Sequence, residues 1–426
     1  MDSSVETRIG DSLRKMRFSM VTATLLLASL NTTVLAAPNK SKCSQKTAKG
    51  NQGVVVSENG QFCLDGKPFY FSGTNSYWIN QIPNDVEAVF ESLQQFGEKV
   101  LRIWGFGMVE STLAEPRNPD LAFYQMWING SWYLNTGGNG LQRFDEVVRL
   151  AEKYDVKLII PLTNNWEGYG SMDIYNKQIT GNDTYHDVFY SDSRVVESYQ
   201  RYVNFIVSRY KNSKAIFSWE LANEPRCNGY PAINSGKCTA ATLSQWVKDQ
   251  SQYIKSIDPQ HMVCVGDEGF YNRPGAADYE YNGGSGLDFD ANLQISTIDF
   301  GTFHLYPQSW AKKDIAAWGT QYIKDHIASG KQNNKPIVME EFGVEGYGNK
   351  TAIYPEWLQT ALDGDIAGIM PWQWGQLGLT TGGVVQYGDS TVGGASPNDG
   401  YTIYPNQTEV WEMFKNVVKT QDAKCG

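Results

Sequence analysis

Apolar, strand-like runs alternate with amphipathic helical segments along most of this chain of 426 residues. Residues 192–210 give the clearest helical pattern, with one broad apolar stripe. Strands are expected at residues 69–75, 99–106, 157–164, 216–224, 262–267, 298–306, 336–342 and 367–373. Helices are expected at residues 85–97, 141–154, 192–210, 242–257, 314–328, 353–363 and 408–419, with a less regular stretch near 287–296. Because strands that alternate with helices form parallel sheets, the pattern predicts a closed (β/α)8 TIM barrel of the α/β class.

Segments outside this repeat predict additions to the barrel. Residues 54–66 contain Asn-Gly and Asp-Gly turns, which are typical of hairpins, so we expect a small N-terminal β-hairpin that caps the lower end of the barrel. Residues 107–140 and 167–191 are long connections, and we expect extended βα loops there. A barrel with insertions can reach this length, so residues 53–426 are expected to form a single domain.

The first 37 residues have the pattern of a secretion signal. Basic residues at 14, 15 and 17 precede an apolar run at 18–30, which is too short to span a membrane, and small residues follow at 34–37. We therefore predict a signal peptide at 1–37, a flexible tail at 38–52 and a secreted, extracellular protein. N-glycosylation sequons in the mature region agree with export and stand at Asn39, Asn129, Asn182, Asn349 and Asn406.

Charge and cysteine content limit the partners of the chain. Lys and Arg total 36 against 46 Asp and Glu, and the net charge of -10 disfavours binding to nucleic acid or to an anionic membrane. The six cysteines are compatible with disulfides, and Cys227 and Cys238, which flank a loop, are the expected pair. Cys264 lies in an apolar run, where a buried thiol is as compatible with the sequence as a bridge. No Cys or His residues have the spacing of metal ligands, so the sequence does not predict a metal site.

Residues 216–226, which read I-F-S-W-E-L-A-N-E-P-R, place an acid at the end of a buried strand. Pro225 has no N–H for a strand ladder, so the strand is expected to stop at Glu224. Residues 336–343, P-I-V-M-E-E-F-G, form a second apolar strand that ends in acid. One such glutamate is equally well explained by an ion pair with a neighbouring arginine. Two carboxylates at the carboxyl ends of barrel strands are the minimum needed for glycoside hydrolysis.

Polar or aromatic residues follow the apolar run of other expected strands as well. They are Arg102; Asn164, Asn165 and Trp166; Asn223 and Arg226; His304 and Tyr306; Glu340 and Glu341; and Trp372, Gln373 and Trp374. Each has a structural explanation by itself, such as a buried ion pair for Arg102. Because the carboxyl ends of barrel strands meet at one face, their joint occurrence favours an active site.

Four segments resemble fungal β-mannanases of glycoside hydrolase family 5, in clan A. They are W-E-L-A-N-E-P-R-C, T-N-N-W-E-G-Y-G, F-H-L-Y-P and E-E-F-G, and the resemblance extends from about Phe69 to Phe414. The N-E-P motif is shared by many barrel glycosidases, whereas the N-N-W and N-E-P-R-C segments are more specific to mannanases. The resemblance implies a retaining endo-β-1,4-mannosidase that acts on mannan, glucomannan, galactomannan and manno-oligosaccharides without metal or cofactor. We also expect a monomer.

The resemblance implies a role for each strand-end residue. Glu224 would be the general acid/base, with a pKa raised by burial and by the other carboxylate, and Glu341 would be the nucleophile. Glu341 is preferred to Glu340 because it directly precedes Phe-Gly. The other implied roles are a counter-charge for the nucleophile (Arg102), a hydrogen bond to the sugar 2-hydroxyl (Asn223), a hydrogen bond to the nucleophile (Tyr306), a pocket wall (His304), the sugar-stacking floor (Trp372, with Trp374 as the alternative), a further platform (Trp166) and a contact on the leaving-group side (Arg226).

Some questions stay open in the sequence. Successive residues of a regular strand point to opposite faces, so Asn223 and Glu224 both reach the site only if the chain bends between them. A β-1,4-glucanase or an exo-acting mannosidase on the same barrel would carry the same residues. A non-catalytic carbohydrate-binding protein would share the fold, but it would not need an acid/base pair.

Overall fold

Eight parallel strands form the centre of the protein in this computed structural model, which describes residues 43–44, 52–111, 121–380, 383–387 and 390–426. The strands are β4 (Phe71–Asn75), β5 (Val100–Arg102), β9 (Lys157–Pro161), β10 (Ile216–Glu220), β11 (Met262–Cys264), β12 (Gly301–Leu305), β13 (Ile337–Phe342) and β14 (Gly368–Ile369). Their order in the sheet is β11-β10-β9-β5-β4-β14-β13-β12, and all neighbouring pairs are parallel. Next to β11 and β12, the two ends of that order, the Asp299 N–H donates to the Val263 carbonyl at 2.9 Å. The predicted (β/α)8 barrel is confirmed, and each expected strand contains an observed one.

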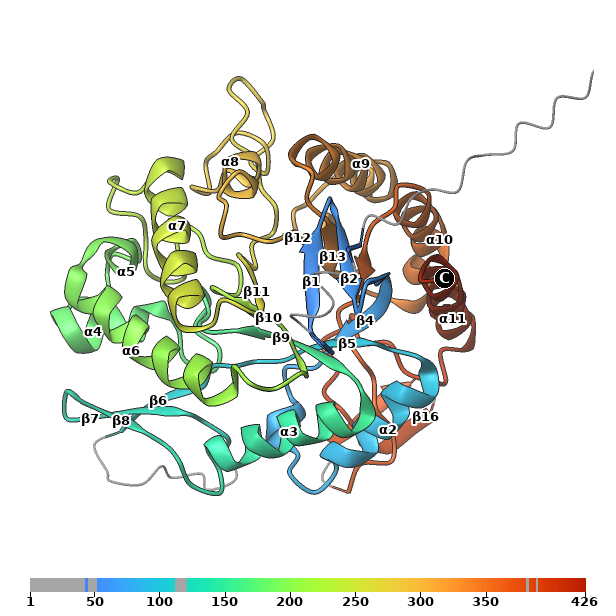
Figure 1. The fold of residues 1–426 in the computed structure, drawn as a ribbon, viewed down its shortest axis with the longest axis horizontal. Coiled ribbons are helices and arrows are strands. Elements are labelled where there is room, and N and C mark those ends of the chain that lie inside the picture. Colours follow the sequence, from blue (N-terminus) through green and yellow to red (C-terminus); the bar gives the residue numbers. More distant parts are fainter. Residues whose placement is uncertain (1–42, 45–51, 112–120, 381–382, 388–389) are drawn as a thin grey trace, which may run out of the picture. The chain divides into compact units, whose positions relative to one another are not determined.

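Helices surround these strands in a ring, as Figure 1 shows. They include α2 (Val86–Phe96), α3 (Leu141–Tyr154), α6 (Ser193–Tyr210), α7 (Ala240–Ile257), α8 (Phe289–Leu293), α9 (Ile315–Asn333), α10 (Tyr347–Asp363) and α11 (Thr408–Lys424). The predicted bounds of α3 are those observed. The sequence pattern places the start of α10 too late: the helix begins at Tyr347 and continues through Pro355, although proline is disfavoured inside helices.

The expected N-terminal hairpin covers one end of the barrel. It consists of β1 (Val55–Glu58) and β2 (Gln61–Leu64), extended by the short β3 (Lys67–Pro68), and it lies across the centre of the ring in Figure 1. Phe62 packs edge-on against the barrel residues Phe217 and Phe300, with ring centroids 5.0 and 5.2 Å apart. A disulfide between Cys43 and Cys63, which the sequence did not predict, fixes the chain before the hairpin. The predicted signal peptide at 1–37 and most of the predicted tail at 38–52 lie outside the described residues.

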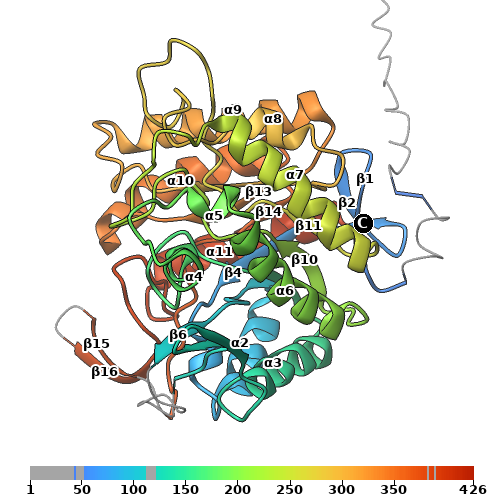
Figure 2. The same ribbon diagram turned by 90° about the vertical axis from the view of Figure 1, so that its left-hand side faces the viewer.

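The long βα connections carry secondary structure that the sequence pattern missed. They contain β6 (Met108–Ser111), β7 (Gln125–Ile128), β8 (Ser131–Leu134), α4 (Met172–Thr180), α5 (Val188–Ser191), β15 (Gly383–Tyr387) and β16 (Ser390–Ala395). A short 3-10 helix (Ile79–Gln81) follows β4. In Figure 2 the β15–β16 hairpin lies on the opposite side of the drawing from β1 and β2. Among the described residues, no helix combines the length and the apolar character needed to cross a membrane.

The barrel interior changes character along its axis. Near the hairpin it is filled by apolar side chains, among them Val100, Phe217 and Val338. Towards the carboxyl ends of the strands it contains fully buried charged groups, among them Arg102 and Glu220. Burial of charge is costly unless each charge is paired, so this end of the barrel is where function is expected.

Candidate active site

A cavity of about 520 Å³ opens at the carboxyl ends of the barrel strands. Its walls come from the segments after β4, β5, β9, β10, β12, β13 and β14 and include Tyr77, Trp104, Asn164, Trp166, Tyr169, Asn223, Glu224, Arg226, Tyr306, Trp310, Glu341, Trp372, Asp399 and Tyr401. Most of the residues that the sequence singled out therefore meet in one place. Arg102 and His304 do not line the cavity but lie fully or almost fully buried beneath it.

Glu224 and Glu341 form the carboxylate pair of this cavity. One oxygen of each carboxylate and one ring nitrogen of His304 all lie within 4.8 Å of one another. Retaining glycosidases hold their two carboxyl groups about 5–5.5 Å apart, whereas inverting enzymes need about 6.5–9.5 Å to accommodate a water molecule. The close approach of the two carboxylates is therefore compatible with the retaining arrangement and its covalent intermediate.

The backbone bends sharply where Glu224 leaves the barrel. β10 ends at Glu220, and Glu224 has a φ of 52°, in the left-handed region. The backbone N–H of Asn223 donates to Thr163 on one side, and that of Glu224 donates to Gly266 on the other, each at 2.8 Å. This bend lets both side chains line the cavity, as the sequence required, at a cost of about 1–2 kcal/mol for a residue with a Cβ atom.

Arg102 lies below the cavity and contacts residues near the ends of both β10 and β13. Its Nε and Nη2 atoms donate to the two carboxylate oxygens of Glu220 at 2.9 and 2.8 Å, which is a bidentate pair. Its Nη2 also donates to Asn223 Oδ1 at 2.7 Å, and its Nη1 pairs with Glu341. Arg102 is thus the expected counter-charge of Glu341, and it also orients Asn223. Glu220 was missed because it lies within the apolar run of its own strand.

His304 bridges two carboxylates. Its Nδ1 lies 2.7 Å from Glu224 Oε1, and its Nε2 lies 3.3 Å from Glu340 Oε2. The other carboxylate that lines the cavity, Glu341, accepts a hydrogen bond at its Oε2 from the Tyr306 hydroxyl at 2.8 Å, as expected. The strand register shifts between Phe303 and His304.

Glu340 and Glu341 are separated by the alternation of the strand. Glu340 is fully buried inside the barrel, beside His304 and 3.7 Å from Arg102 Nε, and does not line the cavity. Glu341 lines it. The geometry therefore favours Glu341 as the residue that meets a ligand.

The pKa values of the pair differ from the expectation. Burial alone would raise the pKa of Glu224, but its hydrogen bond with His304 and the charge of that ring lower it to about 2. Burial raises the pKa of Glu341, although the charges of His304 and Arg102 oppose this. The expected rise in the pKa of Glu224 is therefore wrong for the unliganded site. Burial lowers the pKa of His304, but the surrounding carboxylates, Glu341 first, raise it far above its ordinary value.

Two tryptophans occupy positions on the cavity wall. Trp372 stacks almost parallel to Tyr77, with ring centroids 5.7 Å apart and an interplanar angle of 9°, and its Nε1 donates to Asp399 at 2.6 Å. Trp166 lies on the acid side, where its Nε1 donates to Glu224 Oε2. Trp374 is buried in the core against Trp411, so it is not an alternative floor.

Arg226 forms the wall beyond Glu224. Its Nε donates to Glu268 at 2.6 Å, and its guanidinium lies over the rings of Trp166 and Phe270, 5.2 and 4.9 Å from their centroids. Burial raises the pKa of Glu268 to about 6, against the effect of Arg226. The next residue, Cys227, forms the predicted disulfide with Cys238, whereas Cys264 has a free, buried thiol. No sequence motif indicated Glu268 as part of this wall.

Two groups among the described residues have the donor atoms of a metal site. They are Glu224, His304 and Glu341, and Glu220, Cys264 and Glu340. In both, the carboxylates already have a cationic neighbour in the protein, because Arg102 contacts Glu220, Glu340 and Glu341. An added cation would therefore meet a site that already contains the positive charge of Arg102.

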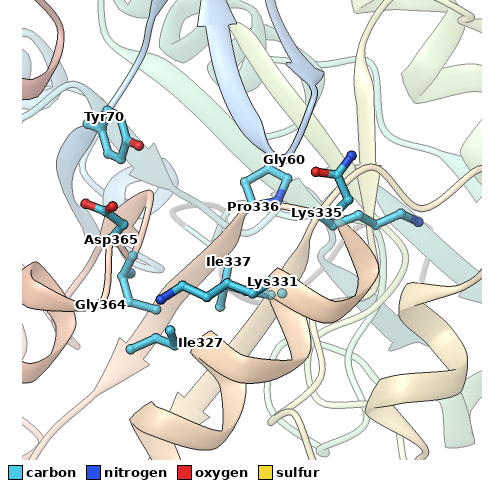
Figure 3. A pocket seen from close by; sticks show the side chains of 12 residues that line it. Gly60, Tyr70, Ile327, Lys331, Lys335, Pro336, Ile337, Gly364 and Asp365 are labelled. Carbon is cyan, nitrogen blue, oxygen red and sulfur yellow. The ribbon is translucent and has the colours of Figure 1, made fainter. Parts of the chain in front are cut away.

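The opposite end of the barrel contains a smaller cavity of about 200 Å³ (Figure 3). Gly60 of the N-terminal hairpin, Lys331 and Lys335 near the end of α9, and Asp365 before β14 lie around it. Only one carboxylate lines it, and that residue pairs with Lys424 at 3.0 Å. The described residues that line this cavity therefore include no pair of acids for hydrolysis.

A (β/α)8 barrel with two close carboxylates at the carboxyl ends of its strands defines a retaining glycoside hydrolase. The sequence matches the family model described as "GH family 5 beta-mannosidase-like" over residues 52–360. It is 43% identical to the mannan endo-1,4-beta-mannosidase A of Aspergillus aculeatus over 352 residues, which are 82% of this chain and 85% of that protein. It is 38% identical to the enzyme of the same name from Hypocrea jecorina over 403 residues, which are 94% of this chain and 84% of that protein.

A solved structure of a mannanase is also similar to this chain. The endo-1,4-beta-mannanase from Rhizomucor miehei matches with a TM-score of 0.76 and 38% sequence identity, covering 87% of this chain and 99% of that one. The chain belongs to the β-mannosidase-like group of glycoside hydrolase family 5.

Proposed function

We propose that this protein is an endo-β-1,4-mannosidase that cleaves internal bonds of mannan, glucomannan and galactomannan with retention of anomeric configuration. The close pair of Glu224 and Glu341 in the cavity is the observation that carries the proposal. The relatives named mannan endo-1,4-beta-mannosidase cover most of this chain and support mannan over cellulose as the substrate and internal over terminal cleavage.

In the first step, Glu341 attacks the anomeric carbon of the sugar in the cavity. The bond from this carbon to the glycosidic oxygen breaks as the bond to the Glu341 carboxylate forms, and the leaving oxygen takes a proton from Glu224. The proton reaches Glu224 from His304 Nδ1, which is in hydrogen-bond contact with it before substrate binds. Arg102 and Tyr306 hold the attacking carboxylate in place.

In the second step, Glu224 removes a proton from a water molecule that attacks the same carbon. The ester bond to Glu341 breaks, and the configuration of the substrate is restored by the second inversion. The side-chain amide of Asn223, held by Arg102 and by Asn164 at 2.9 Å, is placed to bind the sugar 2-hydroxyl. Trp372 supplies the stacking floor beneath the sugar, and Trp166 and Arg226 extend the wall towards the leaving group.

The test is product analysis on mannan, glucomannan and cellulose in parallel. We expect manno-oligosaccharides of several lengths from mannan, no products from cellulose, and the β anomer as the first product seen by NMR. Preferential attack on cellulose would identify a glucanase, and release of mannose alone would identify an exo-acting enzyme. The α anomer as first product would overturn retention, and binding without any product would identify a carbohydrate-binding protein.

We also propose that the protein is secreted. The disulfides Cys43–Cys63 and Cys227–Cys238 support this, because such bonds persist in oxidising compartments. Mass spectrometry of the protein from culture supernatant should give a mature chain that starts near residue 38. Retention of the protein inside the cells would contradict this.

A further inference from the structure

A second hollow, of about 440 Å³, lies beside the catalytic cavity. The two share a wall: Glu167 lines the second hollow, and its neighbours Trp166 and Gly168 line the catalytic cavity. The rest of the second hollow comes from β6, from residues 171–184 after β9 and from residues 230–233 after β10. We call this hollow the side cavity.

The side cavity lies on the acid side of the catalytic cavity. The segments that form it flank Trp166 and Arg226, which contact Glu224 and its surroundings. None of its lining residues comes from β13, which carries Glu341, or from the segment after β14, which carries Trp372. In a retaining glycosidase the acid protonates the leaving group, so the side cavity lies where the leaving part of the chain departs.

Carboxylates and exposed apolar groups line the side cavity together. Glu110 pairs with Lys177 at 3.1 Å, but Glu167 and Asp183 have no ion-pair partner among the described residues. At the rim, the side chains of Tyr230 and Ile233 are 73% and 55% exposed. Carboxylate oxygens accept hydrogen bonds from sugar hydroxyls, and a tyrosine ring packs on the apolar face of a sugar. The excess of negative charge disfavours anionic ligands.

The exposed side chains are held by a fixed loop. The Cys227–Cys238 disulfide closes it, and its residue Ile233 exchanges backbone hydrogen bonds with Thr184 and His186 at 3.0 and 2.9 Å. A loop fixed in this way presents Tyr230 to a ligand at a small cost in conformational entropy.

We propose that the side cavity is a distal sugar-binding site, which receives a residue of the polysaccharide on the leaving-group side of the cleaved bond. The proposal rests on the hydrolase function above. It predicts that the side cavity raises kcat/KM for long substrates. Short substrates, which end before the side cavity, should not benefit from it.

The experiment compares wild type, Tyr230→Ala and Tyr230→Phe on β-1,4-linked oligomers from mannotriose to manno-octaose. The proteins are made without N-glycans, because the Asn182 sequon adjoins Asp183 on the rim. Tyr133→Ala is the matched control, since Tyr133 is 49% exposed but lines neither cavity. For Tyr230→Ala we expect unchanged kcat/KM on the shortest substrates and a loss of about fivefold, equivalent to about 1 kcal/mol, once the chain reaches the side cavity. Tyr230→Phe, which keeps the ring, should behave as wild type.

An equal loss at every chain length, or no loss at any, would overturn the proposal, as would the same pattern in Tyr133→Ala. An isotope label at the reducing end gives a second readout: Tyr230→Ala should move the preferred cleavage point of long oligomers towards the reducing end. If wild type itself fails to cleave mannan, the hydrolase function fails. If it cleaves mannan but Tyr230→Ala shows no dependence on length, only the side-cavity site fails.

Discussion

The Nδ1 atom of His304 lies 2.7 Å from the Oε1 atom of Glu224, so this carboxylate is in hydrogen-bond contact with a second group that can hold a proton. The charge of His304 lowers the pKa of Glu224 and also acts to lower that of Glu341. His304 is therefore placed to set the pH range of both carboxylates at once.

Replacement of His304 by Gln should narrow the pH profile of kcat/KM. On the acid side of the profile Glu341 must be ionised, and on the basic side the proton that His304 passes to Glu224 must still be bound. Loss of the positive charge raises the pKa of Glu341, so the acid limb should shift upward, by about 1–3 pH units for an opposite charge at this distance. The variant also loses His304 itself, whose pKa the carboxylates raise, so the basic limb should shift downward. Thermal unfolding of the variant controls for a folding defect. An acid limb that stays in place or moves downward, or a basic limb that moves upward, would contradict the assigned role.

Glu224→Ala should separate acid catalysis from nucleophilic attack. Turnover of mannan should fall by about 10²–10⁴-fold, because its leaving alkoxide needs a proton. Formation of the glycosyl-enzyme from an aryl glycoside with a good leaving group should suffer less. Azide should restore turnover and give the β-glycosyl azide, because this anion attacks the intermediate without a general base. Rescue of Glu341→Ala instead, with the α-azide as product, would reverse the two roles.

Glu340 and Glu341 should differ sharply in covalent labelling and in their effect on turnover, although they are neighbours in the sequence. A slowly turned-over fluorinated mannoside should label Glu341, which peptide mass spectrometry can localise, because only this residue of the two lines the cavity. Glu341→Gln should abolish both labelling and turnover. Glu340→Gln should still be labelled, with reduced turnover through its contact with His304. Label on Glu340 would refute the assignment.

The amino-acid pattern predicts the barrel and the pair of carboxylates that lines the cavity well, because both depend on local properties. A strand such as β13 is apolar on both faces, and its acidic end is visible in the chain itself. The buried acids that pair with the arginines of the site are harder to predict from the sequence. Glu220 and Glu268 have no motif of their own, and their role follows only from the three-dimensional placement of Arg102 and Arg226.

Residues 107–140 and 167–191 were predicted as loops, but β6 and α4 lie within them, and the β15–β16 hairpin lies in a connection for which no element was predicted. These elements are short, so tertiary contacts, such as those of α4 with α6, rather than a long apolar period stabilise them. The low pKa of Glu224 was missed for a similar reason, because the ring of His304 that causes it comes from a different strand.

Glu98→Gln should stabilise the protein in a pH-dependent manner. Glu98 is buried, and this burial raises its pKa to about 8 from 4.5. Between these values the unfolded chain releases a proton that the folded chain keeps, so stability falls as pH rises from about 4.5 to 8. At pH 7 the cost is about 3 kcal/mol, which Gln would remove. Denaturant unfolding at about pH 5 and pH 8 should give a larger gain at the higher pH. An equal gain at both values would show that Glu98 is not the titrating group.

The left-handed backbone at Glu224 sets the side chain and the backbone of this position against each other. Glycine adopts that conformation without strain, but it would remove the carboxylate that contacts His304 and accepts a hydrogen bond from Trp166. Loss of this side chain would leave a buried imidazole and an indole N–H without their partner, which is itself costly. The contacts of the carboxylate, and not the preference of the backbone, therefore keep a glutamate here.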